Sequence, residues 1–373
     1  MTRREFIVAG LGLLGTAAAG GAYAYVHLPK FGNLPTGERL RRMQASPHYH
    51  GDHFENLVPV SVMSEEEGEH ENRLVATWKF LFGDKTGLVP DGPLPTQKTD
   101  LSALSRERDA VVWLGHSSFF VQLGGYRILI DPVFSSYASP LWCINRAFAG
   151  SNVYTADDFP EIDVLALSHD HWDHLDYSTV MALKPKVRQV VCPLGVGAYF
   201  EQWGYPAESI HEEDWGAEIK LEETLSVHIL PSQHFSGRFL KQNLTLWCGM
   251  AFLTPKRSLY YTGDGGYGAH FQDIGRTFGG FDCVLAENGQ YNLAWHAIHM
   301  LPEETTQACD DVGARLVIPA HNSKFALARH PWQEPMVRLE EASRGRSYRL
   351  LTPKIGALID LASPADTSDW WRG

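Results

Sequence analysis

Nine residues decide the fold of this 373-residue chain: Ser168-His169-Asp170-His171-Trp172-Asp173-His174-Leu175-Asp176. They follow the apolar run Val164–Leu167, which is typical of a buried strand, and they precede Ser178–Leu183, which has a helical pattern. A loop that leaves the end of a strand lets polar side chains converge without being tied to one face of a helix. The stretch therefore predicts a strand–loop–helix unit of an α/β fold, with its polar side chains gathered at the end of the strand.

The donor types in this loop indicate a centre with two metal ions. His169 and His171, which are two residues apart, can reach one ion, and Asp173 and His174 beyond the turn can reach a second. Imidazole and carboxylate groups suit Zn²⁺, with iron and manganese as alternatives. One loop cannot complete two metal sites, so further donors are required elsewhere in the chain.

Three donors downstream supply the remainder, because His234, Asp264 and His321 each stand a few residues past an apolar, strand-like run. Satisfied core or surface histidines would explain each position alone. Core packing does not explain polar metal donors at successive strand ends in this order, so we interpret the whole set as one metal centre. The predicted ligands are His169, His171, Asp173, His174, His234, Asp264 and His321.

From residue 111 onward, short β-like runs alternate with helical patterns, which predicts a layered α/β body rather than a repeat array. We expect one domain at 101–373 and, at 27–100, an N-terminal extension rich in Pro, Gly and charge that packs on it. The predicted strands are Val111–Leu114, Phe119–Leu123, Arg127–Ile130, Asp163–Ser168, Gln189–Cys192, Leu225–Leu230, Leu246–Leu253, Ser258–Thr262, Asp282–Ala286 and Arg315–Ala320. The predicted helices are Leu74–Phe82, Ser178–Leu183, Val196–Trp203, Phe271–Phe278 and Pro302–Val312.

The composition is that of a globular protein, with 44% hydrophobic and 20% charged residues. A formal net charge of −12 disfavours a nucleic-acid partner, because phosphate binding depends on Lys and Arg. The five cysteines are widely spaced and include no C-x-x-C pair. Their odd number leaves at least one free thiol even where a disulfide forms, and we expect buried core cysteines.

Residues 1–26 have the features of an export signal. Arginines at positions 3 and 4 precede the uncharged run Phe6–Val26, which contains the small-residue triplet Ala22-Tyr23-Ala24 and resembles a twin-arginine signal. A transmembrane anchor is the alternative, because the run is about long enough to span a bilayer, although its glycines make it only weakly hydrophobic. We expect an exported protein, periplasmic or anchored to the membrane, and leave cleavage of the segment open.

Several segments besides the metal loop carry a resemblance to a known family. They are Trp113–Ser117, Asp131–Ser136, Pro231–His234, Gly263–Tyr267 and His299–Glu304. Through them, most of the chain resembles the metallo-β-lactamase superfamily and, within it, the N-acylphosphatidylethanolamine phospholipase D-like branch. The resemblance implies a four-layered αβ/βα sandwich with two zinc ions at one edge of two facing sheets. It implies that one zinc is held by His169, His171 and His234, that the other is held by Asp173, His174 and His321, and that Asp264 bridges them.

The resemblance also implies a zinc-dependent phosphodiesterase of the phospholipase D type. A hydroxide that bridges the metals would attack, and Asp173 would orient or deprotonate it. His299 is the candidate proton donor or substrate contact. The expected substrate is a phospholipid or a small phosphodiester or ester, with association at a membrane surface. Because residues 287–292 and 321–325 differ from those of the mammalian lipase, hydrolysis of a small lactone or cyclic phosphodiester, an iron oxidoreductase and a non-catalytic metal protein remain alternatives.

Other motifs are interpreted as supports or set aside. His116 and Asp131 are expected to orient metal ligands, and Trp172 and Trp295 to line an apolar pocket. The segment His48–His53 repeats the H-x-H-x-D-H pattern but follows no strand, so we expect a surface or pocket-rim segment. The G-x-G-x-x-G pattern at 263–268 contains an aspartate, which would repel a pyrophosphate and argues against a dinucleotide site.

Overall fold

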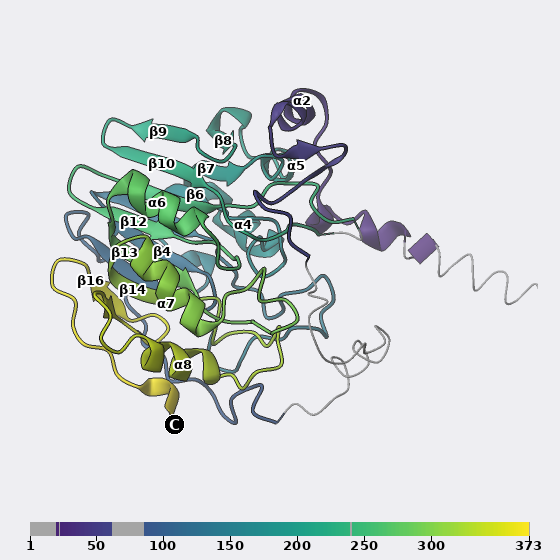
Figure 1. Ribbon diagram of the computed structural model, residues 1–373. Helices are drawn as coiled ribbons and strands as arrows, with labels where there is room; N and C mark the ends of the chain where they lie inside the picture. Colours follow the sequence, from purple (N-terminus) through teal and green to yellow (C-terminus); the bar gives the residue numbers. More distant parts are fainter. Residues whose placement is uncertain (1–19, 22, 62–85, 239–240, 373) are drawn as a thin grey trace, which may run out of the picture.

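The computed structural model describes residues 20–21, 23–61, 86–238 and 241–372 (Figure 1). The helix predicted at Leu74–Phe82 lies outside the described residues, and so do residues 1–19 and 22 of the predicted export signal. Within the described part of the chain, no helix has the length and apolar character needed to cross a membrane.

Two seven-stranded sheets form the body. The first has the order β16-β3-β4-β5-β6-β7-β8, and the second has the order β15-β14-β13-β12-β11-β10-β9. The strands of the first sheet are β3 (Ala110–Trp113), β4 (Phe119–Leu123), β5 (Tyr126–Ile130), β6 (Ile162–Ala166), β7 (Val187–Pro193), β8 (Ile210–Glu213) and β16 (Leu358–Asp360). Those of the second are β9 (Glu218–Glu222), β10 (Leu225–Leu230), β11 (Gly249–Leu253), β12 (Ser258–Tyr261), β13 (Phe281–Glu287), β14 (Ala314–Ala320) and β15 (Arg349–Leu350).

Both sheets begin with antiparallel pairs and continue with parallel ones. Strands β3 to β5 pair antiparallel and β5 to β8 pair parallel, while β9 to β12 pair antiparallel and β12 to β15 pair parallel. Gly124 and Gly125 form the two-residue turn between β4 and β5, with φ angles of 57° and 88°. Such turns need positive φ, which glycine adopts without strain.

Helices cover the outer faces of the two sheets (Figure 1). Helices α4 (Tyr177–Leu183) and α5 (Gly197–Gln202) pack on the first sheet, and α6 (His270–Phe278) and α7 (Pro302–Asp311) pack on the second. Between the sheets lies one large core, which also receives Met336 of α8 (Glu334–Ala342). Both faces of each sheet are therefore buried, as parallel strands require. The predicted four-layered αβ/βα sandwich is confirmed.

The remaining elements lie near the N-terminus or are short. Helix α2 (Gly37–Ala45) and the hairpin of β1 (Tyr49–His50) and β2 (His53–Phe54) belong to the predicted N-terminal extension. Arg39 of α2 lies 2.9 Å from Glu201 of α5 and also pairs with Glu212 of β8, which holds this segment on the body. The 3₁₀ helices are η1 (Pro29–Phe31), η2 (Ala156–Asp158), η3 (Lys184–Lys186), η4 (Ala207–Ser209) and η5 (Trp370–Arg372).

Several elements differ from the prediction. The strand predicted at Leu246–Leu253 begins only at Gly249, because Leu246 and Trp247 pack as a loop against Met43 and Phe54. Strands β8, β9, β15 and β16 and helices α2 and α8 were not predicted. The sequences of β8 and β9 are charged because these strands form sheet edges, and β15 and β16 are too short to show a pattern. All five cysteines are free thiols; four are buried as expected, and the prediction was wrong for the exposed Cys143.

Candidate metal centre

The predicted metal loop leaves the carboxyl end of β6 and leads into α4. The backbone N–H of Ser168 donates to Asp131 Oδ1 at 2.8 Å, and the Ser168 carbonyl accepts from the N–H of Cys248 at 2.9 Å. At the far end, the Asp176 side chain accepts from the N–H of Ser178 and caps α4. The loop is thus anchored to both sheets and to a helix.

Three imidazoles form the first group, of which His169 and His234 are buried and His171 is half-buried. His171 Nδ1 lies 2.9 Å from His169 Nε2 and 3.3 Å from His234 Nε2. Burial lowers the pKa of His171 to about 4 and that of His234 to about 3, and it lowers the pKa of His169 well below its usual value. All three rings are therefore neutral at pH 7, and converging neutral imidazole nitrogens are suitable ligands for a cation.

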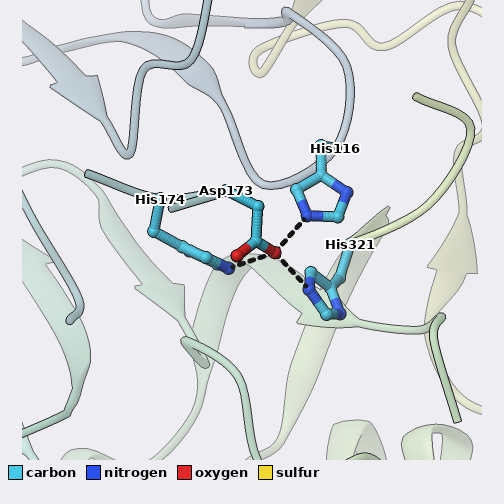
Figure 2. Close-up of side chains that lie close together, drawn as sticks. All are labelled: His116, Asp173, His174 and His321. Carbon is cyan, nitrogen blue, oxygen red and sulfur yellow. Dashed lines mark hydrogen bonds and ion pairs between the residues drawn. The ribbon is translucent and has the colours of Figure 1, made fainter. Parts of the chain in front are cut away.

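The second group gathers around Asp173 (Figure 2). Asp173 Oδ2 lies 3.2 Å from His321 Nε2 and 3.4 Å from His174 Nε2. His116 Nε2 lies 2.8 Å from the same oxygen. Asp173 is a buried carboxylate that three imidazoles face, and they come from three different parts of the chain.

Asp264 lies between the two groups. Its Oδ2 is 3.0 Å from both His174 Nε2 and His321 Nε2, and it is 4.0 Å from His169 Nε2 and 3.9 Å from His234 Nε2. The structure therefore brings the predicted ligands together in the two sets of three that the resemblance implies, with Asp264 central. That these side chains bind metal remains a prediction.

An unpaired polar atom and the charges of the centre fit a cation. Asp264 Oδ1 is buried and has no hydrogen-bond partner among the described residues. An unsatisfied buried polar group costs about 1–3 kcal/mol. Burial lowers the pKa of His174, but Asp264 and Asp173 outweigh it and raise this pKa well above its usual value. A proton on His174 thus supplies positive charge beside the two carboxylates, and a bound cation would supply this charge instead.

Unusual backbone conformations cluster here. His116, Asp131 and His321 have φ angles of 55°, 39° and 63°, which are uncommon for residues other than glycine. A Cβ at Gly266 would lie 2.0 Å from the carbonyl oxygen of Ala297, so only glycine permits this approach beside Asp264. Strained backbone of this kind is typical of functional sites.

Asp131 and His116 contact proposed ligands, as predicted from the sequence. Asp131 Oδ2 lies 2.8 Å from His174 Nδ1 and accepts from the hydroxyl of Tyr261 at 2.7 Å. This contact places the ring proton of His174 on Nδ1 and leaves Nε2 for a ligand. His116 contacts Asp173. The contacts of Asp264 found among the described residues do not include His116.

His299 stands at the edge of the centre. Its ring is stacked on that of His321, with centroids 5.0 Å apart and an interplanar angle of 14°. A ring nitrogen of His299 lies within 4.8 Å of ligand atoms of His234 and Asp264. Its Nδ1 lies 2.9 Å from Oε1 of Glu287, a fully buried residue that the sequence analysis did not single out. The available signal was an acidic residue at the end of an apolar strand, as at Asp131.

The segment His48–His53 forms the β1–β2 hairpin, and none of the groups of potential metal ligands among the described residues includes it. Asn56, which follows it, does reach the centre: it donates to the carbonyl of His234 at 2.8 Å and accepts from the N–H of His234 at 3.0 Å.

The G-x-G-x-x-G pattern at 263–268 contributes Asp264 to the centre. Trp172 stacks on the guanidinium of Arg238 at 3.8 Å.

Comparisons with known proteins agree with this geometry. Residues 126–322 match the family model described as "Beta-lactamase superfamily domain". An uncharacterized protein of Mycobacterium tuberculosis is 38% identical over 333 residues, which are 88% of each chain. The N-acyl-phosphatidylethanolamine-hydrolyzing phospholipase D 1 of Caenorhabditis elegans is 30% identical over 300 residues, 75% of this chain and 80% of that protein. The solved structure of Igni18, a metallo hydrolase from Ignicoccus hospitalis, shares the fold, with a TM-score of 0.52 and 19% identity over 67% of this chain and 97% of that one.

Proposed function

This chain belongs to the metallo-β-lactamase superfamily, in its N-acylphosphatidylethanolamine phospholipase D-like branch, and we propose that it hydrolyses a phosphodiester bond of a phospholipid. As a member of this family it is a metal-dependent hydrolase. The observation that carries the proposal is the position of Asp264 between two sets of three donors, in a chain similar to an enzyme named for cleaving this lipid class.

The proposed cofactor is a pair of zinc ions. His169, His171 and His234 would hold one ion, Asp173, His174 and His321 would hold the other, and Asp264 would contact both. When bound, two such ions lower the pKa of a water molecule to about 7 and polarise the phosphoryl oxygens. Only divalent cations that accept nitrogen and oxygen ligands suit this set, with iron and manganese as alternatives to zinc.

The remaining chemistry belongs to the side chains. In the hydrolysis, the water oxygen bonds to phosphorus, the bond from phosphorus to the leaving alcohol oxygen breaks, and that oxygen gains a proton. Asp173, whose Oδ2 faces three imidazoles, is the proposed acceptor of the proton lost by water. His299 is the proposed donor to the alcohol, because it lies at the edge of the centre and Glu287 holds its Nδ1.

A substrate at a lipid surface is supported by exposed apolar residues in the two segments that carry Asn56 and His299. Leu57 and Val58 are 55% and 62% exposed and directly follow Asn56, which binds the backbone of His234. Leu293 is 74% exposed in the loop that leads to His299. Isolated exposed apolar residues are ordinary, but exposed apolar residues next to a catalytic centre favour a lipid substrate. An exported location, which the N-terminal sequence favours, is part of the same proposal.

The experiment uses the full chain loaded with zinc. Vesicles that contain N-acylphosphatidylethanolamine are incubated with the enzyme, and ³¹P NMR follows the appearance of phosphatidic acid. Bis(4-nitrophenyl) phosphate and a lactone panel are assayed beside them, and metal content is measured by mass spectrometry. We expect two zinc ions per chain, phosphodiester turnover, and a loss of at least about 100-fold in kcat/KM for Asp264→Asn.

The matched control is Asp282→Asn on the same sheet, which removes a carboxylate paired with Arg315 at 3.0 Å and should keep activity. Turnover of lactones alone would overturn the proposed phosphodiesterase activity and favour a lactone hydrolase. Iron in place of zinc, with no hydrolysis of either class, would overturn the hydrolase and favour an oxidoreductase.

A further inference from the structure

We propose that Glu287 is a positioning residue that sets the ring orientation and the tautomer of both His299 and His321. The inference rests on the proposed function, in which His321 is a metal ligand and His299 is the proton donor.

The position of Glu287 is rigid. It is the last residue of β13, which lies between β12 and β14, and its side chain is fully buried. The Glu287 N–H donates to Thr262 Oγ1 at 2.9 Å, and its carbonyl accepts from Thr305 Oγ1 at 2.9 Å. Its backbone is therefore held from two sides, by the end of β12 and by the first turn of α7.

One carboxylate faces three potential donors. Glu287 Oε1 lies 2.9 Å from His299 Nδ1 and 3.5 Å from His321 Nδ1. Its Oε2 accepts from the backbone N–H of Met300 at 3.1 Å. The carboxylate thus contacts both rings and also the backbone that carries one of them.

This arrangement decides which nitrogen of each ring carries the proton. A carboxylate accepts hydrogen bonds, so a neutral ring that faces it through Nδ1 carries its proton there and leaves Nε2 bare. In His321, Nε2 is the nitrogen that lies 3.0 Å from Asp264 and 3.2 Å from Asp173. A histidine needs this tautomer to bind metal through Nε2, and a carboxylate behind the ring is a common way to impose it.

The same contact explains the stacking of the two rings. His299 and His321 turn Nδ1 toward one oxygen atom, and their planes lie 14° apart with centroids separated by 5.0 Å. Through Glu287, the orientation of the proposed proton donor is coupled to that of a proposed ligand. A residue that served only to satisfy the N–H of Met300 would not need to contact either ring.

The test compares Glu287→Gln with Glu212→Gln in the full-length, zinc-loaded enzyme. Glu212 is also a buried glutamate, but it pairs with Arg39 and contacts neither histidine. Glutamine has nearly the same shape as glutamate but carries an N–H₂ group in place of one oxygen, so it cannot accept both from the ring N–H groups and from the N–H of Met300. The readouts are the ¹⁵N shifts of the histidine ring nitrogens, zinc content, and kcat and KM for bis(4-nitrophenyl) phosphate.

In Glu287→Gln, we expect the ¹⁵N shifts of His299 to move toward mixed tautomers and the Nδ1 shift of the zinc-bound His321 to change because its carboxylate partner is lost. We expect kcat to fall by about 10–100-fold, with KM within about 2-fold. Glu212→Gln should lose thermal stability yet keep the ring shifts and kcat. Unchanged ring shifts in a folded Glu287→Gln would overturn the inference, and so would an equal loss of kcat in both variants. Should Glu287→Gln not fold, Glu287→Asp keeps the charge but shortens the reach, and the same shift changes are expected from it.

The two proposals fail in different ways. A wild-type enzyme that binds zinc but cleaves no phosphodiester would overturn the proposed function, while the ring shifts would still test Glu287. A wild-type enzyme that cleaves the phosphodiester, with ring shifts that do not respond to Glu287→Gln, would overturn this inference alone.

Discussion

His174 illustrates how single hydrogen bonds prepare the centre for a cation. Its Nδ1 faces Asp131 Oδ2 at 2.8 Å, and its Nε2 faces Asp264 Oδ2 at 3.0 Å. Asp131 is itself held by Tyr261 and by the backbone of Ser168. Because an aspartate that accepts from several donors has few alternative positions, the ring of His174 is oriented before any ion binds.

Replacing Asp131 by Asn should therefore weaken metal binding. The amide would set an N–H₂ group against donors on His174, Tyr261 or Ser168, at a cost of about 1–3 kcal/mol in the free energy of unfolding. We expect zinc affinity to fall by about 10–100-fold in competition with a chelator. The control is Asp109→Asn, the same substitution at a carboxylate that accepts from the N–H of Gly124 and contacts none of the proposed ligands. Equal zinc affinity in both variants would contradict the orienting role.

At the scale of elements, the metal loop is held by an N-terminal 3₁₀ helix that lies beside it. Arg238 donates through Nη1 to the carbonyls of Asp170 and Leu175, at 2.9 and 2.7 Å, and through Nη2 to the carbonyl of Lys30 in η1 at 2.8 Å. The ring of Phe31 in η1 packs edge-on against Trp172, with centroids 5.2 Å apart. One buried guanidinium thus links η1 to both ends of the loop.

Arg238→Lys should loosen this loop, since a lysine ammonium lacks the planar fork that reaches all three carbonyls. We expect faster amide hydrogen exchange over residues 169–176 and a loss of about 1–3 kcal/mol in the free energy of unfolding. Arg276→Lys on α6, an exposed arginine that pairs with Asp273, should change stability by less than about 1 kcal/mol. Exchange in the loop that matches the wild type would show that η1 and Arg238 do not hold it.

For the whole molecule, the centre joins the two sheets. His169, His171, Asp173 and His174 follow β6 of the first sheet, while His234, Asp264 and His321 follow β10, β12 and β14 of the second. A cation bound by donors from both sheets would cross-link the two halves of the sandwich. Since a ligand that binds only the folded state stabilises it by mass action, removal of metal should lower Tm.

The gain in Tm from zinc should increase as pH rises above the usual histidine pKa of about 6.5. The pKa values of His174 and His321 are raised above the usual value of about 6.5, because Asp264 and Asp173 outweigh burial. A histidine whose pKa is higher in the folded than in the unfolded state stabilises the folded protein at pH values below its unfolded pKa. This contribution to the free energy of unfolding is lost as pH rises through the folded pKa. The metal-free protein therefore loses it, while bound zinc replaces the protons. Calorimetry with and without a chelator tests this, and a gain that does not change with pH would contradict it.

The local sequence determined the donors and their places at the ends of strands, because strand periodicity and ligand chemistry are properties of short segments. The loop at 168–176 and the downstream His234, Asp264 and His321 could all be predicted in this way. The same reasoning located most of the buried strands, since their apolar runs are continuous.

Only the tertiary structure revealed Asn56 and Arg238 as supports of the centre, and only it showed which rings Glu287 contacts. Asn56 and Arg238 each contact partners more than 60 residues away, so no local pattern marks them. The charged edge strands β8 and β9 likewise form only because neighbouring strands accept their hydrogen bonds. Side-chain chemistry can be judged one segment at a time, but the partner of a buried polar group depends on how distant segments pack.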